Sequence, residues 1–429
     1  MKQTEIGLIP DDWSLEILSK IASFRRGTFP QPYGLPKWYG GPGNYPFVQV
    51  ADLSDDKFEL NENTNQTISK LAQERSLFVP KGSVIVTLQG TIGRVAITQY
   101  DCFMDRTLAV FEYFKKKISK EYFALALHEK FQIEAKLAPG GIIKTITKEV
   151  FSNFQILLPS SVKEQQRIAK ALSDVDALIS TTEKLIQKKK NIKQGTMQNL
   201  LTGKKRLPGF GPQTKSPAYK QTELGFIPED WEVIKIFGNY FLKGRIGWQG
   251  LKASEFTDKG PYLVTGTDFY NGRVNWESCY HISEERYEED KALHVKLNDI
   301  LITKDGTVGK VAYIDKMPKK VTLNSHLLII RPLKEKLINR YLFYILNSNF
   351  FFDYYQQTQT GTTMASLSQD KISKFVYPLP SKEEQTAIAN VLSSMDKEIE
   401  TLNTKLEKYR NLKTAMMQQL VTGKIRLIK

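Results

Sequence analysis

The sequence lacks the residues from which most metal and disulfide sites are built. Its 429 residues include only two cysteines, Cys102 and Cys279, far apart and outside any CxxC pattern, which excludes a disulfide framework and a cysteine zinc site. The four histidines show no i, i+3 or i, i+4 pairing. No stretch approaches about 18 uninterrupted apolar residues, and the N-terminus has no apolar signal segment. We therefore expect a reduced, cytoplasmic protein with no bound metal and no membrane span.

Catalytic motifs are also missing. The sequence contains no GxxxxGK(S/T) phosphate loop, no GxGxxG after a strand, and no GxSxG, HExxH or zinc-deaminase pattern. The Asp/Asn-Pro-Pro-Tyr motif of an amino-methyltransferase is approached only by residues 30–33, which lack the acid or amide. We expect this chain to have no catalytic centre and to bind no cofactor itself.

Positive charge is abundant. Lys and Arg number 61 against 46 Asp and Glu, a net charge of +15, which favours a polyanionic partner such as nucleic acid or an acidic membrane surface. An apolar content of 41% describes a globular protein. At roughly 100–200 residues per domain, the length predicts two to four domains.

An internal repeat is the strongest signal in the sequence. KQTEIGLIPDDW at residues 2–13 recurs as KQTELGFIPEDW at 220–231, identical at nine of twelve positions. SVIVTLQGTIGRVA (83–96) resembles DILITKDGTVGKVA (299–312), and LPSSVKEQQRIAKAL (158–172) returns as LPSKEEQTAIANVL (379–392). The offsets lie between 216 and 220 residues, so the chain consists of two related halves.

Each half ends in a long helix. Apolar residues alternate in steps of 3 and 4 over about 162–200 and 382–421, which is the heptad pattern of a coiled coil, and Gly203 and Gly423 are natural C-caps. Each apolar seam needs a partner, and pairing of related halves about a pseudo-two-fold axis predicts an antiparallel coiled coil. The seam residues are Ile168, Leu172, Val175, Ile179, Ile186, Ile388, Leu392, Met395, Ile399, Leu402 and Leu406.

The segments before the helices show mixed strand and helix patterns. We expect strands at 45–51, 83–88, 94–98, 261–264, 300–303 and 310–314, and helices around 121–136 and 338–357. The predicted fold class is α+β: two similar mixed α/β domains separated by two long helices that form an antiparallel coiled coil, with a pseudo-two-fold internal repeat. The expected divisions are a first domain at 1–160, a helical region at 161–204, a linker rich in Pro, Gly and Lys at 205–219, a second domain at 220–380 and a second helical region at 381–429.

Most of the excess charge lies outside the helices. The helix at 162–200 carries +4 and the one at 382–421 carries none, so +11 of the +15 remains for the rest of the chain. Candidate DNA contacts are polar loop residues near glycines, where the backbone can approach phosphates closely. Any one of these residues is more often a solvated surface residue than a DNA contact, so the prediction of a DNA-binding surface depends on the whole set. The candidates are Arg25, Arg26, Gln89, Thr91, Arg94, Lys144, Thr145 and Thr147 in the first half, and Lys243, Arg245, Lys304, Thr307, Lys310, Thr362, Thr363, Ser366 and Ser368 in the second.

These motifs together resemble the specificity subunit of type I restriction-modification systems. The matching marks are GLIPDDW (7–13) and GFIPEDW (225–231), GTIGR (90–94) and GTVGK (306–310), and the helix ends LLTGKKRL (200–207) and LVTGKIRL (420–427). The resemblance covers essentially the whole chain. It implies two target-recognition domains, each reading one half of a split, asymmetric sequence of double-stranded DNA, and two conserved helical regions that set the spacing and dock two modification (methyltransferase) subunits.

The resemblance also places the chemistry in other chains. The modification subunits of the family bind S-adenosylmethionine and methylate adenine at N6, and separate restriction subunits with translocase and nuclease activity use ATP and Mg²⁺. With half-sites about one helical turn apart, ~10 bp, we expect an unread spacer of roughly five to eight base pairs.

Two other functions remain open from the residues alone. The chain could be a stand-alone DNA-binding protein that acts without partners, or a degenerate interaction module that no longer reads DNA. A steep negative slope of log affinity against log salt would argue against the second.

Overall fold

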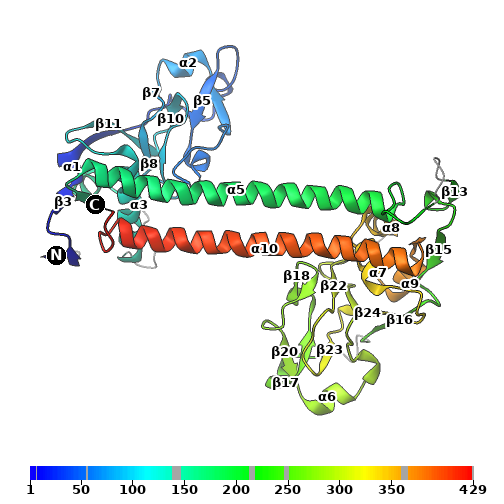
Figure 1. Ribbon diagram of the computed structural model, residues 1–429. Helices are drawn as coiled ribbons and strands as arrows, with labels where there is room; N and C mark the ends of the chain where they lie inside the picture. The colour runs from blue at the N-terminus through cyan, green and yellow to red at the C-terminus, as the bar shows by residue number, and fades with distance from the viewer. Residues whose placement is uncertain are drawn as a thin grey trace. The chain divides into compact units, whose positions relative to one another are not determined.

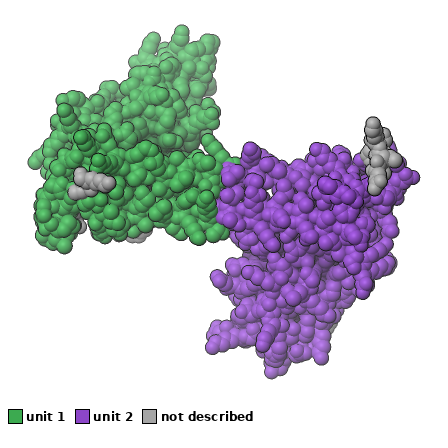
Figure 2. Space-filling view, viewed as in Figure 1, with its two compact units in different colours: residues 1–184, 403–429 green, residues 185–402 purple. Residues whose placement is uncertain are grey.

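The computed structural model describes residues 1–5, 7–54, 57–137, 146–211, 218–245, 251–358 and 366–427. The chain forms two compact units, drawn in green and purple in Figure 2: Met1–Lys184 with Asn403–Lys429, and Leu185–Leu402. Each unit combines one globular domain with part of each of the two long helices, α5 (Val162–Leu201) and α10 (Lys382–Leu420). The expected divisions near 160 and 380 fall close to the helix starts, but the compact units cut across both helices.

The first domain is built from short strands and helices. The strands are β1 (Lys2–Thr4), β2 (Gly7–Ile9), β3 (Trp13–Ile17), β4 (Ala22–Arg26), β5 (Tyr45–Val48), β6 (Gln66–Ile68), β7 (Leu77–Val79), β8 (Val84–Thr87), β9 (Val95–Ile97), β10 (Cys102–Met104), β11 (Leu108–Phe114) and β12 (Gln155–Pro159). The helices before α5 are α1 (Leu18–Ile21), α2 (Lys70–Gln73), α3 (Lys120–Leu137) and α4 (Lys148–Ser152). Figure 1 shows the order along the chain.

The second domain repeats much of this order. Its strands are β13 (Tyr219–Thr222), β14 (Gly225–Pro228), β15 (Glu232–Lys235), β16 (Tyr240–Gly244), β17 (Phe256–Val264), β18 (Phe269–Tyr270), β19 (Arg273–Val274), β20 (Tyr280–Ile282), β21 (Ile300–Thr303), β22 (Val311–Tyr313), β23 (Val321–Leu323), β24 (Leu327–Pro332) and β25 (Val376–Leu379). Its helices are α6 (Glu284–Glu288), α7 (Asn339–Leu346), α8 (Asn349–Thr358) and α9 (Gln369–Lys374).

One four-stranded sheet has the same strand order in both domains. The sheet β4-β11-β8-β9 of the first domain matches β16-β24-β21-β22 of the second. A neighbouring sheet carries the parallel pair β5 and β10 in the first domain and the parallel pair β17 and β23 in the second. The mixed α/β character predicted from the sequence is therefore confirmed in both halves.

The central strands are buried on both faces, which explains their uninterrupted apolar sequences. Val84 and Val86 of β8 face one hydrophobic core, and Ile85 between them faces another. In β21, Ile300 and Ile302 face one core and Leu301 faces the other. Because successive side chains point to opposite faces of a strand, such a strand needs apolar residues at every position.

The expected helix at 338–357 is interrupted, which corrects the sequence prediction. Asn347 and Ser348 separate α7 from α8, and their side chains donate hydrogen bonds to the carbonyls of Phe343 (2.7 Å) and Ile345 (2.6 Å). Such local side-chain bonds compete with the regular helical pattern. The break leaves Phe351 in the core and Phe352 exposed.

The two long helices are antiparallel within each unit, as predicted. In the first unit, Asp176 of α5 forms an ion pair with Lys413 of α10 (2.6 Å), and Glu183 forms one with Arg410 (2.9 Å). Residue numbers therefore increase along α5 while those of the partners on α10 decrease. In the second unit, Lys189 pairs with Glu398 at 2.6 Å, and Lys193 pairs with Asp396. Among the seam residues, Ile168, Leu172, Val175, Ile179, Ile186, Ile388, Leu392 and Leu406 are buried, and Met395, Ile399 and Leu402 are half-buried.

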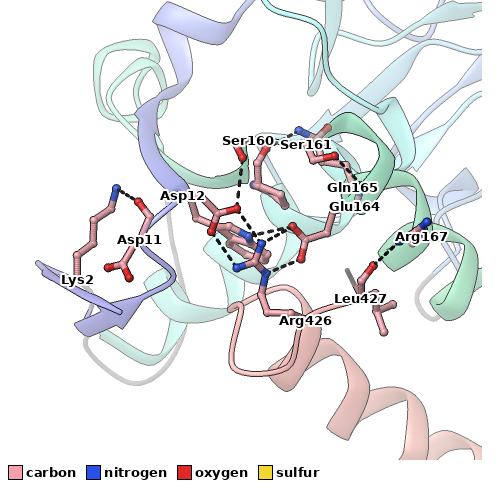
Figure 3. Close-up of polar contacts among 12 residues, drawn as sticks. Lys2, Asp11, Asp12, Ser160, Ser161, Glu164, Gln165, Arg167, Arg426 and Leu427 are labelled. Atoms are coloured by element: carbon pink, nitrogen blue, oxygen red, sulfur yellow. Dashed lines mark hydrogen bonds and ion pairs between the residues drawn. The ribbon is translucent and has the colours of Figure 1, made fainter. Parts of the chain in front are cut away.

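An arginine-glutamate-tryptophan cluster joins the end of α10 to the first domain (Figure 3). The guanidinium of Arg426 donates to both carboxylate oxygens of Glu164 (2.6 and 2.8 Å) and to both oxygens of Asp12 (2.9 and 2.8 Å). The indole Nε1 of Trp13 also donates to Glu164 (3.3 Å). Glu164 is fully buried, so these donors replace the water that its charge would otherwise require.

The second domain has the same cluster at the end of α5. Arg206 donates to Glu384 (2.5 and 2.6 Å) and to Asp230 (3.0 and 2.9 Å), and Trp231 donates to Glu384 (3.2 Å). Arg206 lies in the segment expected to be a flexible linker, of which residues 212–217 lie outside the described residues. The described part of that segment is instead anchored to the domain by this arginine.

Candidate DNA interface

Loops from four parts of the first domain converge beside β8. The backbone N–H of Gly27 donates to Leu108 (3.0 Å), and that of Leu88 donates to Thr107 (2.8 Å). A Cβ placed on Gly90 would lie 3.8 Å from the side chain of Val50, so the turn after β8 touches the turn after β5. We call these segments, residues 27–33, 49–53, 88–94 and 104–108, the first loop cluster.

The second domain gathers the corresponding loops beside β21. The backbone N–H of Lys304 donates to His326 (2.9 Å), and that of Leu367 donates to Lys304 (2.8 Å). Asn324 donates to Val264 at 2.9 Å, as Asp105 donates to Val48 at 3.0 Å in the first domain. We call residues 244–245, 264–268, 303–310, 324–328 and 366–369 the second loop cluster.

The hairpin turn in each cluster is held by the same hydroxyl group. Thr87 donates its hydroxyl to the carbonyl of Thr91 and accepts from the N–H of Arg94 (3.0 Å). Thr303 donates to the carbonyl of Thr307 and accepts from the N–H of Lys310 (2.9 Å). Both threonines are buried, which gives the turns one rigid framework.

The shared framework carries different side chains. Equivalent positions of the two frameworks carry the buried Leu88 in the first cluster and Lys304 in the second. Arg106 and Gln89 of the first cluster are likewise replaced by Ser325 and Asp305. A common scaffold with different exposed groups is suited to reading different base edges.

The structure brings several of the predicted contacts of the first half together. Gln89 and Thr91 are exposed at the tip of the hairpin. Arg94 turns its guanidinium toward the carbonyls of Val50 (3.5 Å) and Leu53 (3.4 Å).

Other predicted contacts of the first half lie at the edge of the cluster. Arg25 pairs with Glu112, Arg26 donates to the carbonyl of Ile146 (3.4 Å), and Thr147 caps α4 by accepting from Val150 (3.2 Å). Lys144 and Thr145 lie outside the described residues.

Some of the predicted contacts of the second half line a hollow of about 340 Å³. Lys304, Ser366 and Ser368 line it, and the ammonium of Lys304 also donates to the carbonyl of Arg245 (3.5 Å). Thr307 and Lys310 are exposed on the hairpin beside it, and Lys243 lies 3.4 Å from Asp290. Thr362 and Thr363 lie outside the described residues.

Arg245 is buried inside the second domain, whereas the sequence pattern predicted that it contacts DNA at the surface. Its side chain is 2% exposed and donates to the carbonyl of Leu323 (3.1 Å) and the hydroxyl of Thr322 (3.4 Å). Burial lowers the pKa of its guanidinium, and the nearby charge of Arg286 lowers it further. In the first domain the corresponding strand position is Gly27, which packs against the backbone of Asp105.

Sequence reasoning missed a polar group in the first loop cluster. The hydroxyl of Tyr33 donates to Asp105 (2.6 Å) and accepts from the side-chain amide of Gln49 (2.9 Å). Asp105 is 3% exposed and also accepts from the backbone and hydroxyl of Thr107 (2.9 and 2.6 Å). The one available signal was that residues 27–41 have no close counterpart in the second half.

A second missed pair lies in the second loop cluster. His326 and Asp305, both partly exposed, approach to 3.4 Å between Nδ1 and Oδ2. The first cluster has Thr107 and Gln89 at these positions, so the two clusters present different hydrogen-bonding groups.

The described residues contain no group of three or more His, Cys, Asp and Glu side chains placed to hold a metal ion. Within the same residues, no helix is both long enough and apolar enough to span a membrane.

A match to the model of a protein family shows which family the chain belongs to. The model described as "Type I restriction modification DNA specificity domain" matches residues 21–194 and 228–408, once for each half of the repeat. The chain belongs to this family. The two matches of the specificity domain contain both loop clusters and most of both long helices.

Relatives of similar length carry the same description. The Type I restriction enzyme MjaVIII specificity subunit of Methanocaldococcus jannaschii is 26% identical over 98% of this chain and 94% of its own length. The putative MjaX specificity subunit of the same organism is 28% identical, over 99% and 96%. The EcoBI specificity subunit of Escherichia coli is 19% identical, over 97% and 87%.

Solved structures share the fold. The S subunit of a type I restriction-modification system from M. genitalium superposes with a TM-score of 0.59 at 14% identity, covering 98% of each chain. A chain from a structural study of complex assembly and conformational transition in the type I system gives a TM-score of 0.56 at 15% identity, covering 97% of this chain and all of the other. At these identities the likeness concerns the fold.

Proposed function

We propose that this chain is the non-catalytic specificity subunit of a type I restriction-modification complex and reads a split, asymmetric DNA sequence. Each loop cluster contacts one half-site. The observation that carries the proposal is the pair of clusters, which have one hydrogen-bonding framework and different exposed side chains. Two identical clusters would favour a palindrome, whereas different ones favour two unlike half-sites.

The long helices have a separate role in this proposal. They set the length of the unread spacer and dock two modification subunits, which bind S-adenosylmethionine and methylate adenine at N6. Restriction subunits, with ATP and Mg²⁺, join the same complex. The names of the relatives, which describe specificity subunits of restriction enzymes, support this division of labour.

Charge favours DNA as the partner of the loop clusters. Lys304 and Lys310 have no carboxylate within ion-pair distance among the described residues, and both lie in the second loop cluster. Cations of this kind neutralise phosphates and release counterions, so that affinity falls steeply as salt rises.

A salt titration of DNA binding tests the proposal. The chain is purified alone and together with a type I modification subunit from the same genome, and binding to a duplex is measured between about 50 and 200 mM salt. We expect the complex to bind with a steep negative slope of log affinity against log salt, and the isolated chain to bind weakly. A slope near zero would support the degenerate module, and tight specific binding by the isolated chain would support the stand-alone protein.

A further inference from the structure

Arg106 stands out among the arginines of the first loop cluster. Its side chain is exposed, and its guanidinium carbon lies 5.8 Å from the centre of the Tyr33 ring. It makes no hydrogen bond or ion pair with any of the residues that the structure describes. A guanidinium that stacks on an aromatic ring keeps its in-plane donors available for a ligand.

The neighbouring arginines are engaged within the domain. Arg25 pairs with Glu112, and Arg26 donates to the carbonyl of Ile146 at 3.4 Å. Arg94 donates to the carbonyls of Val50 and Leu53 (3.5 and 3.4 Å). Arg106 is thus the arginine of this surface with the most donors left for DNA.

Hydrogen bonds hold the hydroxyl of Tyr33, the residue whose ring lies near Arg106. Tyr33 donates to Asp105 at 2.6 Å, and Gln49 donates to the Tyr33 hydroxyl at 2.9 Å. Burial of Tyr33, together with the carboxylate of Asp105, raises the pKa of its hydroxyl, which therefore stays protonated and keeps donating. Asp105 is itself held by two bonds from Thr107.

We propose that Arg106 reads a guanine in the half-site of the first domain, and that Tyr33 is its positioning residue. The guanidinium donates two parallel hydrogen bonds to O6 and N7 of the guanine in the major groove. This inference rests on the proposed function and adds to it the base, the reading residue and the domain that reads it.

The geometry favours a base over a phosphate. A phosphate contact needs only a positive charge near the backbone, which a flexible lysine supplies, whereas bidentate contact to guanine needs a planar fork held in one orientation. The Tyr33 ring lies within cation–π distance of this fork, 5.8 Å from the guanidinium carbon, and is the group that can restrain it. The equivalent position of the second domain is Ser325, so this reading belongs to one half-site only.

The experiment uses the full chain co-expressed with its modification subunit. The wild-type recognition sequence is first obtained from the positions of N6-methyladenine in the host genome. Duplexes are then made in which each base pair of the first half-site is replaced in turn, and the wild-type and Arg106→Ala complexes compete for them.

We expect Arg106→Ala to bind the cognate duplex roughly 5- to 150-fold more weakly and to accept any base at one G·C position. Preferences at all other positions, including the second half-site, stay as in the wild type. Tyr33→Phe keeps the ring but loses the bond to Asp105, so it reduces discrimination at the same base pair by a smaller factor.

Arg75→Ala is the matched control, because the guanidinium carbon of Arg75 also lies near a ring (5.9 Å from the centre of Trp38) but Arg75 is outside the loop cluster. It leaves every base preference unchanged. An unchanged recognition sequence in Arg106→Ala, or equal weakening on all sequences, overturns the inference and leaves the proposed function intact. Absence of any methylated motif with the wild-type chain would instead overturn the proposed function.

Discussion

At the scale of residues, each domain has one buried glutamate that binds an arginine located just after the C-terminus of the other half's long helix. Glu164 and Glu384 start α5 and α10, and their partners Arg426 and Arg206 follow the C-termini of α10 and α5. Both arginines lie in the repeated motifs LLTGKKRL and LVTGKIRL. Their partners could not be predicted, because 262 and 178 residues separate the bonded side chains.

Arg426→Ala should destabilise the first unit strongly. Removing the guanidinium leaves the fully buried Glu164 without its cation, and breaking a buried ion pair on one side costs about 3–5 kcal/mol. Denaturant unfolding of the purified protein measures the free energy of unfolding. Lys424→Ala, an exposed cation of the same segment, is the control, and an equally small effect of both substitutions would contradict the role of the cluster.

The acid sensitivity of the protein should depend on Asp12 and Asp230. Hydrogen bonds from Arg426 and Arg206 lower the pKa of these carboxyl groups below the ordinary value of 3.8. A carboxyl whose pKa is lower in the folded state stabilises the fold above its ordinary pKa, and this stability is lost as pH falls toward the lowered value.

The double variant Asp12→Asn, Asp230→Asn tests this dependence. We expect it to be less stable than the wild type at neutral pH, with a difference that shrinks as pH falls below about 4. Urea midpoints measured from pH 7 down to about 2 give the two curves. A difference that stays constant with pH would show that the charges of these groups do not matter.

At the scale of elements, the long helices were predicted well and the loops were not. Heptad spacing and the glycines at 203 and 423 fix the helix ends, and both glycines adopt positive φ (68° and 73°) as C-caps require. The α7–α8 break escaped prediction because it depends on local bonds from Asn347 and Ser348. The convergence of loops around β8 and β21 depends on sheet topology, which local patterns do not specify.

The hairpin of the second loop cluster should depend on the hydroxyl of Thr303. Thr303→Val leaves the backbone N–H of Lys310 and the carbonyl of Thr307 without the hydroxyl partner that they have in the wild type, whereas Thr303→Ser keeps the hydroxyl. We expect the valine variant alone to lose discrimination at the second half-site, in competition assays with mutated duplexes. If the two variants discriminate equally well at the second half-site, the hairpin takes no part in recognition.

The helices should determine the spacer. Inserting one heptad after Lys184 and another after Leu402, where the compact units divide each helix, preserves the seam and adds ~10 Å of rise, or roughly three base pairs. Methylome sequencing should then report the same half-sites at a larger separation. An unchanged spacer in a stable insertion variant would contradict the ruler role.

At the scale of the whole molecule, the sequence repeat predicted two similar halves but not the boundaries of the two compact units. Each compact unit takes a globular domain, the start of the helix that follows it and the end of the other helix. The core of the first domain accordingly includes Met417, Leu420 and Val421 of the C-terminal segment, and that of the second includes Leu200 and Leu201. Sequence patterns describe the halves in chain order, whereas packing joins distant segments, as the bonds of Arg206 and Arg426 show across 178 and 262 residues.

The most direct test of the central claim is long-read methylation sequencing of a host that expresses this chain with its modification subunit, compared with the modification subunit alone. We predict N6-methyladenine at one split, asymmetric motif, present only when this chain is expressed. With both proteins confirmed as soluble, the absence of a new motif, or a palindromic one, would contradict recognition of two unlike half-sites by the two loop clusters.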